Sequence, residues 1–450
     1  MSSELIISVS GLRGIVGETL TAEVAAHYAL AYESTLDFGP ILITRDGRAS
    51  GGMLGDAIAA VLAARGREVV DAGVAATPTT GVLVKHQRCV GGIQISASHN
   101  PIEWNGLKLF GVDGRVISAT SGEVVMERFA AADPQPLPGD ASHAMNIRRL
   151  EETIEDHWHL IEGIVDAPRI RAAKFKVLLD SNHGAGGLLG RRLLKELGCQ
   201  LEIFGGTPDG RFAHTPEPTA ENLAEIAPQV AQRGAVIGFC QDPDADRLAV
   251  IDEAGRYLGE EYTLAMCVDH VLRQKVGPVV TNCSTSRMSQ DLAEKYGAAF
   301  YRSKVGEANV TDMMIEHGAI IGGEGNGGTI DPRVVYVRDS FVGMALLLDA
   351  MAARQKTISE LAGELPRYAM VKTKVALAKE KLPAALAALE KHFADAETDA
   401  LDGLRFDWPG RWLLVRASNT EPIVRIMAEA ADAKAAETMC DDAGGVIARV

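Results

Sequence analysis

The sequence lacks the features that would place the protein outside the cytoplasm. Its six cysteines are scattered and form no C-x-x-C pair, which argues against a disulfide framework or a zinc site. The first residues, MSSELIISVS, carry no basic region and no long apolar core, unlike a signal peptide. No run approaches the ~18 apolar residues that a membrane helix needs. We therefore expect a cytoplasmic protein with no membrane partner.

An excess of positive charge is also absent. The chain has 45 Lys and Arg against 60 Asp and Glu, for a net charge of −15, which argues against nucleic acid as a partner. A small phosphorylated ligand is still compatible, provided that cations gather locally. Several basic residues do lie in Gly-, Ser- and Asp-rich turns: Arg13, Arg45, Arg48, Arg247, Lys304, Arg416 and Arg425.

What the sequence does contain is a threefold repeat. An apolar strand, a polar loop, a helix ending at glycine and a second strand recur at 41–73, 176–206 and 278–306. Strands that alternate with helices predict parallel sheet, and their repetition predicts three related α/β domains. The last part of the chain has runs of strands with two helices, which indicates a smaller α+β domain.

Domain boundaries are expected at the breaks in this pattern. Segment 131–145 is punctuated by proline and glycine and resembles a linker, and further boundaries are expected near 253–258 and at Leu365-Pro366. The predicted domains are 1–145, 146–254, 255–366 and 367–450.

Ser98 is a candidate nucleophile. In GGIQISASHNPIEWNGLKLFG (91–111) a strand runs into a polar turn that exposes Ser98 beside His99 and Asn100. A plain turn uses such residues as well. A serine hydroxyl can form a covalent intermediate when its neighbours activate it.

Asp242, Asp244 and Asp246 are a candidate metal site. They alternate in FCQDPDADRLAVIDEAG (239–255), so they can converge after a strand. Carboxylates ~4 Å apart repel by roughly 4 kcal/mol at an effective dielectric near 20, so such a group favours a cation. All-oxygen ligation suits Mg²⁺ or Ca²⁺. An EF-hand is excluded because Arg247 stands where that loop needs glycine and the flanks are strand-like.

Two further loops have polar residues suited to a sugar phosphate. AIIGGEGNGGTIDP (319–332) matches G-x-G-x-x-G only formally, since Glu324 would face a pyrophosphate and no helix follows at once. A glutamate that binds sugar hydroxyls fits better, and a flexible loop is equally compatible. In RWLLVRASNTEPIVRIMAE (411–429) hydroxyl, amide and guanidinium groups suit a phosphate; these are Arg416, Ser418, Asn419, Thr420 and Arg425. A Walker loop is missing, which disfavours an ATP-dependent sugar kinase.

Together these segments resemble the α-D-phosphohexomutase family over essentially the whole chain. SGLRGIVG (10–17) is similar to its N-terminal loop, SASHNP to its phosphoserine loop and DPDADR to its metal loop. SKVGEANV and GGEGNGG are similar to its sugar-binding loops, and RASNTEP to its phosphate loop. The resemblance implies three topologically similar α/β domains and a smaller α+β domain around a central cleft.

The resemblance also implies roles for individual residues. Ser98 would carry the phosphate and, with the three aspartates, bind one Mg²⁺ per chain. His99, Lys108, Arg13 and Arg247 would assist catalysis. The substrate-binding residues implied are Lys304, Glu307, Glu324, Asn326, Arg416, Ser418, Asn419, Thr420 and Arg425.

The implied reaction converts hexose 6-phosphate and hexose 1-phosphate into each other. Phospho-Ser98 gives its phosphoryl group to the sugar, and the hexose 1,6-bisphosphate, which also serves as activator, turns over and returns the other phosphate. The sequence departs from many members by having Asn326 and Gly328 where they have serine and histidine. Because that histidine is assigned acid/base work in some relatives, His99 and Lys108 become the candidates for this role.

The preferred sugar is expected to be glucosamine phosphate. Relatives acting on it tend to carry an acid at the position of Glu307, and a carboxylate favours a cationic 2-amino group. Phosphomannomutase/phosphoglucomutase activity is the alternative, and Glu307 could instead cap a helix beginning at Ala308. A serine phosphatase on phosphosugars and a non-catalytic binding protein are the other classes considered. The chain is expected to be a monomer or a homodimer.

Overall fold

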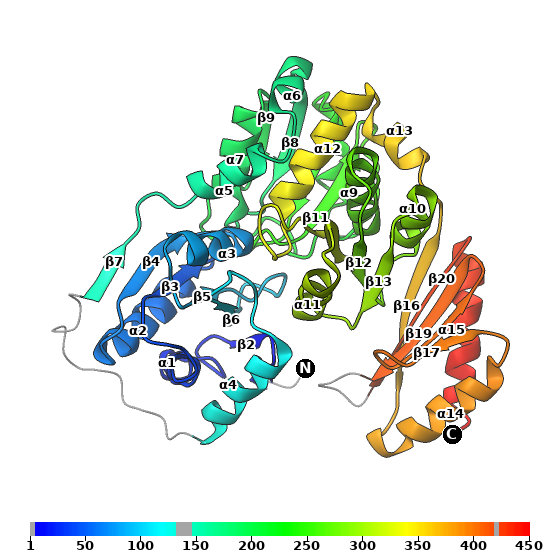
Figure 1. Cartoon of the computed structure of the whole chain (residues 1–450), viewed down its shortest axis with the longest axis horizontal. Helices are drawn as coiled ribbons and strands as arrows, with labels where there is room; N and C mark the ends of the chain where they lie inside the picture. Colours follow the sequence, from blue (N-terminus) through cyan, green and yellow to red (C-terminus); the bar gives the residue numbers. More distant parts are fainter. Residues whose placement is uncertain (1–4, 132–145, 418–422) are drawn as a thin grey trace.

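Three of the four sheets in the computed structural model share one arrangement of four strands (Figure 1). The model describes residues 5–131, 146–417 and 423–450, so most of the expected linker lies outside the described residues. In chain order, the first strand of each set pairs in parallel with both the second and the third strand. The third strand then pairs antiparallel with the fourth. The predicted threefold α/β repeat is therefore confirmed.

The repeated elements are as follows. The first set is β3 (Ile41–Arg45), α2 (Ser50–Ala64), β4 (Val69–Val74), β5 (Gly91–Ile95) and β6 (Trp104–Gly111). The second set is β8 (Lys176–Asp180), α7 (Gly186–Glu196), β9 (Gln200–Phe204), β10 (Ile237–Gln241) and β11 (Leu248–Asp252). The third set is β12 (Val279–Asn282), α10 (Met288–Tyr296), β13 (Phe300–Ser303), β14 (Ile321–Glu324) and β15 (Gly328–Ile330).

Strands of the second sheet are buried and largely apolar because helices cover the sheet. Every residue of β10 and β11 is buried. The helix α7 approaches β10 so closely that a Cβ at Gly186 would lie 2.2 Å from Oε1 of Gln241. Glycine at this position therefore lets the helix pack onto the sheet.

The first sheet is extended at both edges. β1 (Ile6–Ser8) and β2 (Gly11–Ile15) are added beyond β6, and β7 (Ile147–Arg149) pairs in parallel with β4. This sheet thus includes residues beyond position 145. Its other helices are α1 (Ala22–Glu33), α3 (Thr77–His86) and α4 (Ala119–Ala131).

One long helix joins the second and third domains. The first twelve of the 15 residues of α12 (Ser340–Arg354) are all buried, as expected for a helix that is apolar all round. In Figure 1 it runs, in yellow, between α7 and α9. The other helices of these domains are α5 (Glu155–Glu162), α6 (Ala167–Ala173), α8 (Ala227–Gln232), α9 (Glu260–Gln274), α11 (Glu307–His317) and α13 (Ile358–Gly363).

The fourth sheet is antiparallel throughout, in the order β16-β20-β19-β18-β17. Its strands and helices are β16 (Ala369–Ala376), α14 (Leu382–His392), β17 (Glu397–Asp399), β18 (Leu404–Trp408), β19 (Arg411–Ala417), β20 (Ile423–Ala430) and α15 (Ala433–Ile447). One face packs on the two helices, and the other brings Trp412, Leu414 and Met427 against Cys283 of the third domain. The predicted α+β domain is confirmed.

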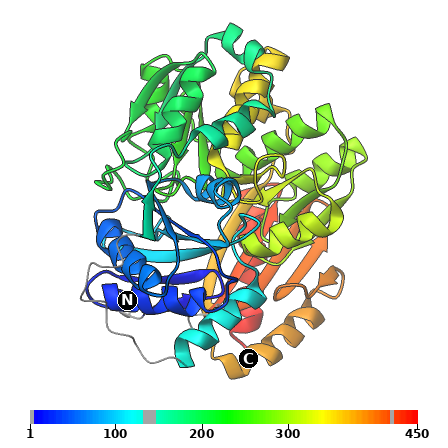
Figure 2. The same cartoon turned by 60° about the vertical axis from the view of Figure 1, so that its left-hand side comes forward.

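The four units follow one another around an arc in chain order (Figures 1 and 2). Within the described ranges, no helix combines the length and the apolar character that crossing a bilayer requires.

Candidate active site

The same turn of each repeat supplies residues to one site. The turn between β5 and β6 carries Ser98, the turn between β10 and β11 carries the three aspartates, and Glu324 ends β14 at the turn into β15. Because the repeats share one topology, these turns come from equivalent places in the three sheets. Contacts between their side chains, described below, bring them together.

The loop of Ser98 is buried and held in an uncommon backbone conformation. Ser98 is 2% exposed and has φ of 49°, which is unfavourable for a residue other than glycine. Arg48 stabilises the loop by donating to the carbonyl oxygens of Ser98 (2.9 Å) and Asn100 (2.5 Å). Asp46 pairs with Arg48 and accepts from Ser96, whose hydroxyl in turn accepts from the Ser98 amide at 2.9 Å.

Ser98 contacts the aspartate cluster directly. Its hydroxyl donates to Oδ2 of Asp242 at 2.8 Å, across 144 positions of sequence. The Nδ1 atom of His99 lies 3.4 Å from the same hydroxyl. The predicted nucleophile and the predicted metal loop are therefore neighbours.

The three aspartates meet as the alternation predicts. Asp242, Asp244 and Asp246 are fully buried and offer one oxygen each, all within 4.8 Å of one another. Ala245 has φ of 58°, a tight turn that lets alternate side chains converge. Among the described residues, Oδ1 of Asp244 and Oδ1 of Asp246 have no hydrogen-bond partner. Buried anionic oxygens of this kind fit a divalent cation such as Mg²⁺.

Lys108 is a buried cation beside this cluster. Its ammonium group donates to Asp244 at 3.1 Å and to Asp246 at 2.9 Å. Although burial opposes it, the two carboxylates raise the pKa of Lys108. Burial and the two neighbouring carboxylates raise the pKa of Asp242. Although burial opposes it, Lys108 lowers the pKa of Asp244. Arg338 and Lys108 lower the pKa of Asp246 in the same way, against burial.

Two further arginines lie near the serine loop. Arg13 donates to Oδ1 of Asn100 at 3.1 Å, and Arg247 donates to Glu217 at 3.3 Å. Burial, followed by the charges of Arg247 and Arg13, lowers the pKa of His99 to about 3. His99 is thus a neutral imidazole near pH 7, and Lys108 an ammonium.

In the third domain, the carboxylate of Glu324 is already engaged. Its Oε1 accepts from Asn282 (2.7 Å) and from the Gly306 amide (3.1 Å). Asn326 accepts from the Gly328 amide at 3.3 Å, which stabilises the turn. Lys304, two residues before Gly306, is exposed to solvent.

Glu307 is the first residue of α11 rather than the residue before it. The helix therefore begins one position earlier than expected from the sequence. The Glu307 carboxylate accepts from the backbone amide of Arg338 at 2.7 Å, outside its own helix. Burial raises its pKa, against the opposing charges of Arg338 and Lys108.

Arg338 is a site residue that the sequence analysis did not identify. Its guanidinium donates at 2.6 Å both to Asp246 and to Glu324. It lies outside every recognised motif, in the segment between β15 and α12. The sequence around Arg338, a basic residue directly before the aspartate that caps α12, has no local pattern that predicts a site residue.

The fourth domain presents basic side chains from adjacent strands. Arg416 and Arg425 are register partners on β19 and β20, and Lys374 is the partner of Arg425 on β16. Arg416 also pairs with Asp402 at 3.2 Å. The predicted Ser418, Asn419 and Thr420 lie outside the described residues.

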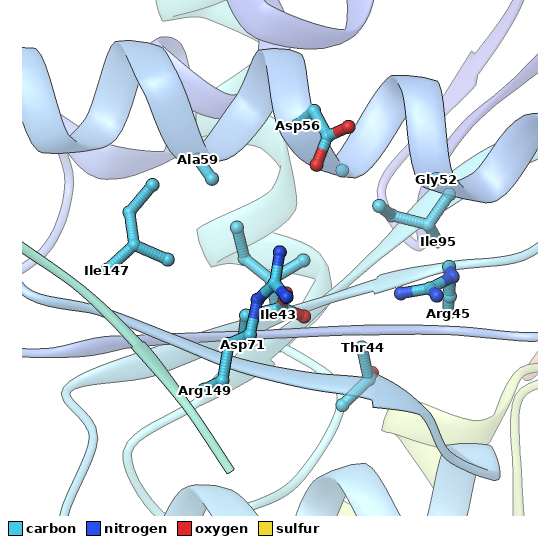
Figure 3. A pocket seen from close by; sticks show the side chains of 11 residues that line it. Ile43, Thr44, Arg45, Gly52, Asp56, Ala59, Asp71, Ile95, Ile147 and Arg149 are labelled. Carbon is cyan, nitrogen blue, oxygen red and sulfur yellow. The ribbon is translucent and has the colours of Figure 1, made fainter. Parts of the chain in front are cut away.

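Arg45, another basic residue noted in the sequence, lines a different cavity. This cavity of about 170 Å³ lies between α2 and the first sheet (Figure 3). Arg149 from β7 also points into it, with Asp56 and Asp71 close by.

The comparisons with known proteins cover all four domains. Residues 5–136, 155–255 and 260–368 match phosphoglucomutase/phosphomannomutase alpha/beta/alpha domains I, II and III, and residues 370–443 match the C-terminal domain of the same proteins.

Individual relatives are similar over nearly the whole chain. A phosphoglucomutase/phosphomannomutase of Thermococcus kodakarensis is 37% identical over 93% of both chains. A protein of Methanopyrus kandleri named "probable phosphoglucosamine mutase" is 31% identical over 98% of this chain and 97% of its own. A solved phosphoglucomutase/phosphomannomutase family protein of Burkholderia thailandensis superposes with a TM-score of 0.83 at 28% identity and covers 98% of each chain.

Proposed function

Because the chain belongs to the α-D-phosphohexomutase family, we propose that Ser98 is the phosphoryl carrier of a hexose phosphate mutase. The observation that carries this proposal is the hydrogen bond between the Ser98 hydroxyl and Asp242, inside a cluster of three buried carboxylates. A buried serine beside such a cluster suits transfer of a phosphoryl group, in which a developing charge must be neutralised.

In this reaction the bond between phosphorus and the Ser98 oxygen breaks while a bond to the free sugar hydroxyl forms. The proton of the sugar hydroxyl passes to a base, the freed Ser98 oxygen takes up a proton, and the hexose 1,6-bisphosphate then reverses its orientation in the site. Its other phosphoryl group returns to Ser98, so phosphate is conserved and no water is consumed.

Asp242, Asp244 and Asp246, with the phosphoserine, would hold one Mg²⁺. The buried Oδ1 atoms of Asp244 and Asp246, which find no hydrogen-bond partner within the described part of the chain, support this assignment. When bound, the cation supplies neutralisation of charge on the transferring phosphoryl group. Lys108 adds a fixed positive charge beside the same carboxylates.

Arg416 and Arg425 would bind the phosphate that is not reacting. They are neighbours on adjacent strands, and guanidinium groups bind phosphate oxygens in pairs. From the sequence alone, Ser418, Asn419 and Thr420, which lie between these arginines in the chain, are proposed to add donors to the same phosphate. Arg13 and Arg247, close to the Ser98 loop, would bind the phosphoryl group on the side of Ser98.

We propose glucosamine 6-phosphate and glucosamine 1-phosphate as the preferred substrates. The support is Glu307, a buried carboxylate at the start of α11 near Lys108 and Arg338. A cationic 2-amino group would gain from such a carboxylate by ~1 to 3 kcal/mol over a neutral hydroxyl. The names of several relatives agree with this sugar, and that of the Thermococcus protein supports a phosphoglucomutase/phosphomannomutase as the alternative.

The test is to incubate the pure protein with Mg²⁺, a trace of hexose 1,6-bisphosphate and, in turn, the 1-phosphates of glucosamine, glucose and mannose. Formation of the 6-phosphate supports the mutase. Free phosphate instead would identify a phosphatase, and no product would contradict the catalytic proposal. Glu307→Gln should lower kcat/KM for glucosamine phosphate about 10-fold relative to glucose phosphate; an unchanged ratio would contradict the role of Glu307.

We also propose a cytoplasmic location. The cysteines that the structure describes are all free thiols, five of them buried. Free thiols suit a reducing compartment, and this is where a sugar phosphate would be available as substrate.

A further inference from the structure

We infer that Arg338 is a positioning residue that couples the cation site to the sugar site. This inference rests on the proposed function, and it concerns a residue outside all the recognised motifs. Arg338 would hold the carboxylate of Asp246 and the carboxylates of Glu324 and Glu307 in one arrangement, so that both sites form together.

The guanidinium of Arg338 contacts carboxylates from three separate segments. It donates to Asp246 and to Glu324 at 2.6 Å each, and its Nε lies 3.6 Å from Glu307. The side chain is 10% exposed, so these pairs are shielded from solvent. A guanidinium has donors in a fixed fork and can satisfy several carboxylates at once, which an ammonium group cannot do with the same geometry.

The backbone of Arg338 is fixed by its neighbours. Its amide donates to Glu307, and the next residue, Asp339, caps α12 through the amides of Phe341 and Val342. Asp339 also pairs with the buried His157 at 2.7 Å. Arg338 therefore projects from the start of the helix that joins the second and third domains.

The stem of Arg338 lies on Gly328. A Cβ at position 328 would stand 2.3 Å from Cδ and 2.7 Å from Cγ of Arg338. The stem has little freedom to move, since one end is fixed by the backbone and the other by three carboxylates. Glycine at position 328 is therefore a requirement of Arg338, and this accounts for the departure seen in the sequence.

The contact with Asp246 has a consequence for cation binding. Oδ2 of Asp246 accepts from both Arg338 and Lys108, and this pairing orients Oδ1, which has no partner among residues 5–131, 146–417 and 423–450. Loss of Arg338 would leave Lys108 as the remaining donor to Oδ2 of Asp246 among the described residues. It would also free Oε2 of Glu324, while Oε1 stays bound to Asn282 and the Gly306 amide. Cation affinity and sugar selection should then fall together.

The experiment compares Arg338→Met, Arg338→Lys and Gly328→Ala with wild type and with Arg333→Met. Arg333 is an exposed arginine five residues earlier that pairs with the buried Asp331, so it controls for the loss of an arginine beside a buried carboxylate. Mg²⁺ binding is measured by calorimetry without substrate, and kcat/KM is measured for glucosamine and glucose phosphates. Thermal melting reports whether each variant is folded.

We expect Arg338→Met to weaken Mg²⁺ binding about 10-fold and to lower kcat/KM about 100-fold, with a smaller preference between the two sugars. Arg338→Lys should recover part of the Mg²⁺ affinity but not the sugar preference, because one ammonium cannot reach all three carboxylates. Gly328→Ala should resemble Arg338→Met although the arginine is intact, and Arg333→Met should resemble wild type.

A folded Arg338→Met that keeps wild-type Mg²⁺ affinity and sugar preference would overturn the inference, as would a Gly328→Ala that behaves as wild type. If Arg338→Met does not fold, the Lys and Gly328→Ala variants give the same decision. Mg²⁺ binding is measured without turnover, so a wild type that binds Mg²⁺ but yields no hexose phosphate isomer would contradict the proposed function and leave the coupling test valid.

Discussion

At the residue scale, the site depends on two non-glycine residues in left-handed backbone conformations. Ser98 and Ala245 lie in the equivalent turns of the first two domains, with φ of 49° and 58°. Each costs conformational free energy on the order of 1 kcal/mol, which surrounding contacts must offset. Asp46 and Arg48 provide these contacts for the serine loop.

Ser98→Ala should abolish turnover while the protein stays folded. The lost hydrogen bond to Asp242 is worth about 1 kcal/mol, so the melting temperature should change little. Intact-protein mass spectrometry after incubation with hexose 1,6-bisphosphate should show one added phosphate on wild type and none on the variant. Ser118→Ala, at a serine paired only with Ser121 in its own turn, is the control. Full activity in the Ser98 variant would contradict a covalent phosphoserine.

Asp244→Asn should remove activity and weaken Mg²⁺ binding by about 10-fold or more. The amide keeps the size of the side chain, and it removes one of the three negative charges that favour a divalent cation. Lys108 still pairs with Asp246 in this variant, so the expected loss comes from the cation site. Calorimetric titration with Mg²⁺ and assays after treatment with a chelator measure this effect. Wild-type activity that survives complete chelation would contradict the metal assignment.

At the element scale, equivalent loops have taken on different tasks. The loop after β3 supports the serine turn through Asp46 and Arg48. The corresponding loop after β8 holds Asn182 and His183 at positive φ, and Asp180 at the end of the strand pairs with His214 at 2.7 Å. The pair holds His214 in place, and Glu217, three residues later, pairs with Arg247.

His214→Gln should destabilise the protein more at pH 5.5 than at pH 9. Burial acts against it, but the hydrogen bond and charge of Asp180 raise the pKa of His214 above its usual value near 6.5. The stabilisation is therefore complete below that value and is lost as pH rises through the raised pKa. Urea unfolding of wild type and variant at both pH values measures the loss in the free energy of unfolding. At pH 5.5 this loss should be about 1 kcal/mol. An equal loss at both pH values would contradict the charged pair.

At the scale of the whole molecule, hydrogen bonds, an ion pair and an apolar cluster join the fourth domain to the third. Asp402 forms an ion pair with Arg416 at 3.2 Å and accepts a hydrogen bond from the Val305 amide at 3.0 Å. Arg405 donates to the Cys283 carbonyl, beside the apolar contact of Trp412 and Leu414. Asp402 thus links the proposed phosphate-binding arginine to the loop that precedes Glu307.

Asp402→Ala should raise KM for the hexose phosphate about 10-fold with a smaller change in kcat. Without this carboxylate, Arg416 and the loop at Val305 are no longer held at a fixed separation. A substrate that contacts both must then fix their positions when it binds, and the entropy cost of doing so weakens binding. Steady-state kinetics measure the split. Asp395→Ala is the matched control, because Asp395 bonds Trp408 within the fourth domain. Equal KM values for the two variants would contradict a link between domains.

The sequence by itself determined the three repeats, the smaller α+β fourth domain and the loops that carry Ser98 and the aspartates. These features are local: a run of apolar residues, a glycine at a helix end and alternating carboxylates leave their mark within about 20 positions. The expectation that Asp242, Asp244 and Asp246 converge was therefore confirmed by their geometry.

The tertiary structure alone decided which distant side chains share these carboxylates. Arg338 meets Asp246 across 92 positions, and Asp402 meets the Val305 amide across 97. Neither contact leaves a local pattern, since an isolated arginine or aspartate occurs on any surface. From the sequence, Gly328 was only a departure from the residue that many family members carry at this position. The structure shows that the stem of Arg338 occupies the space that a side chain at position 328 would need. Close packing between separate domains created that constraint, and no spacing along the chain encodes it.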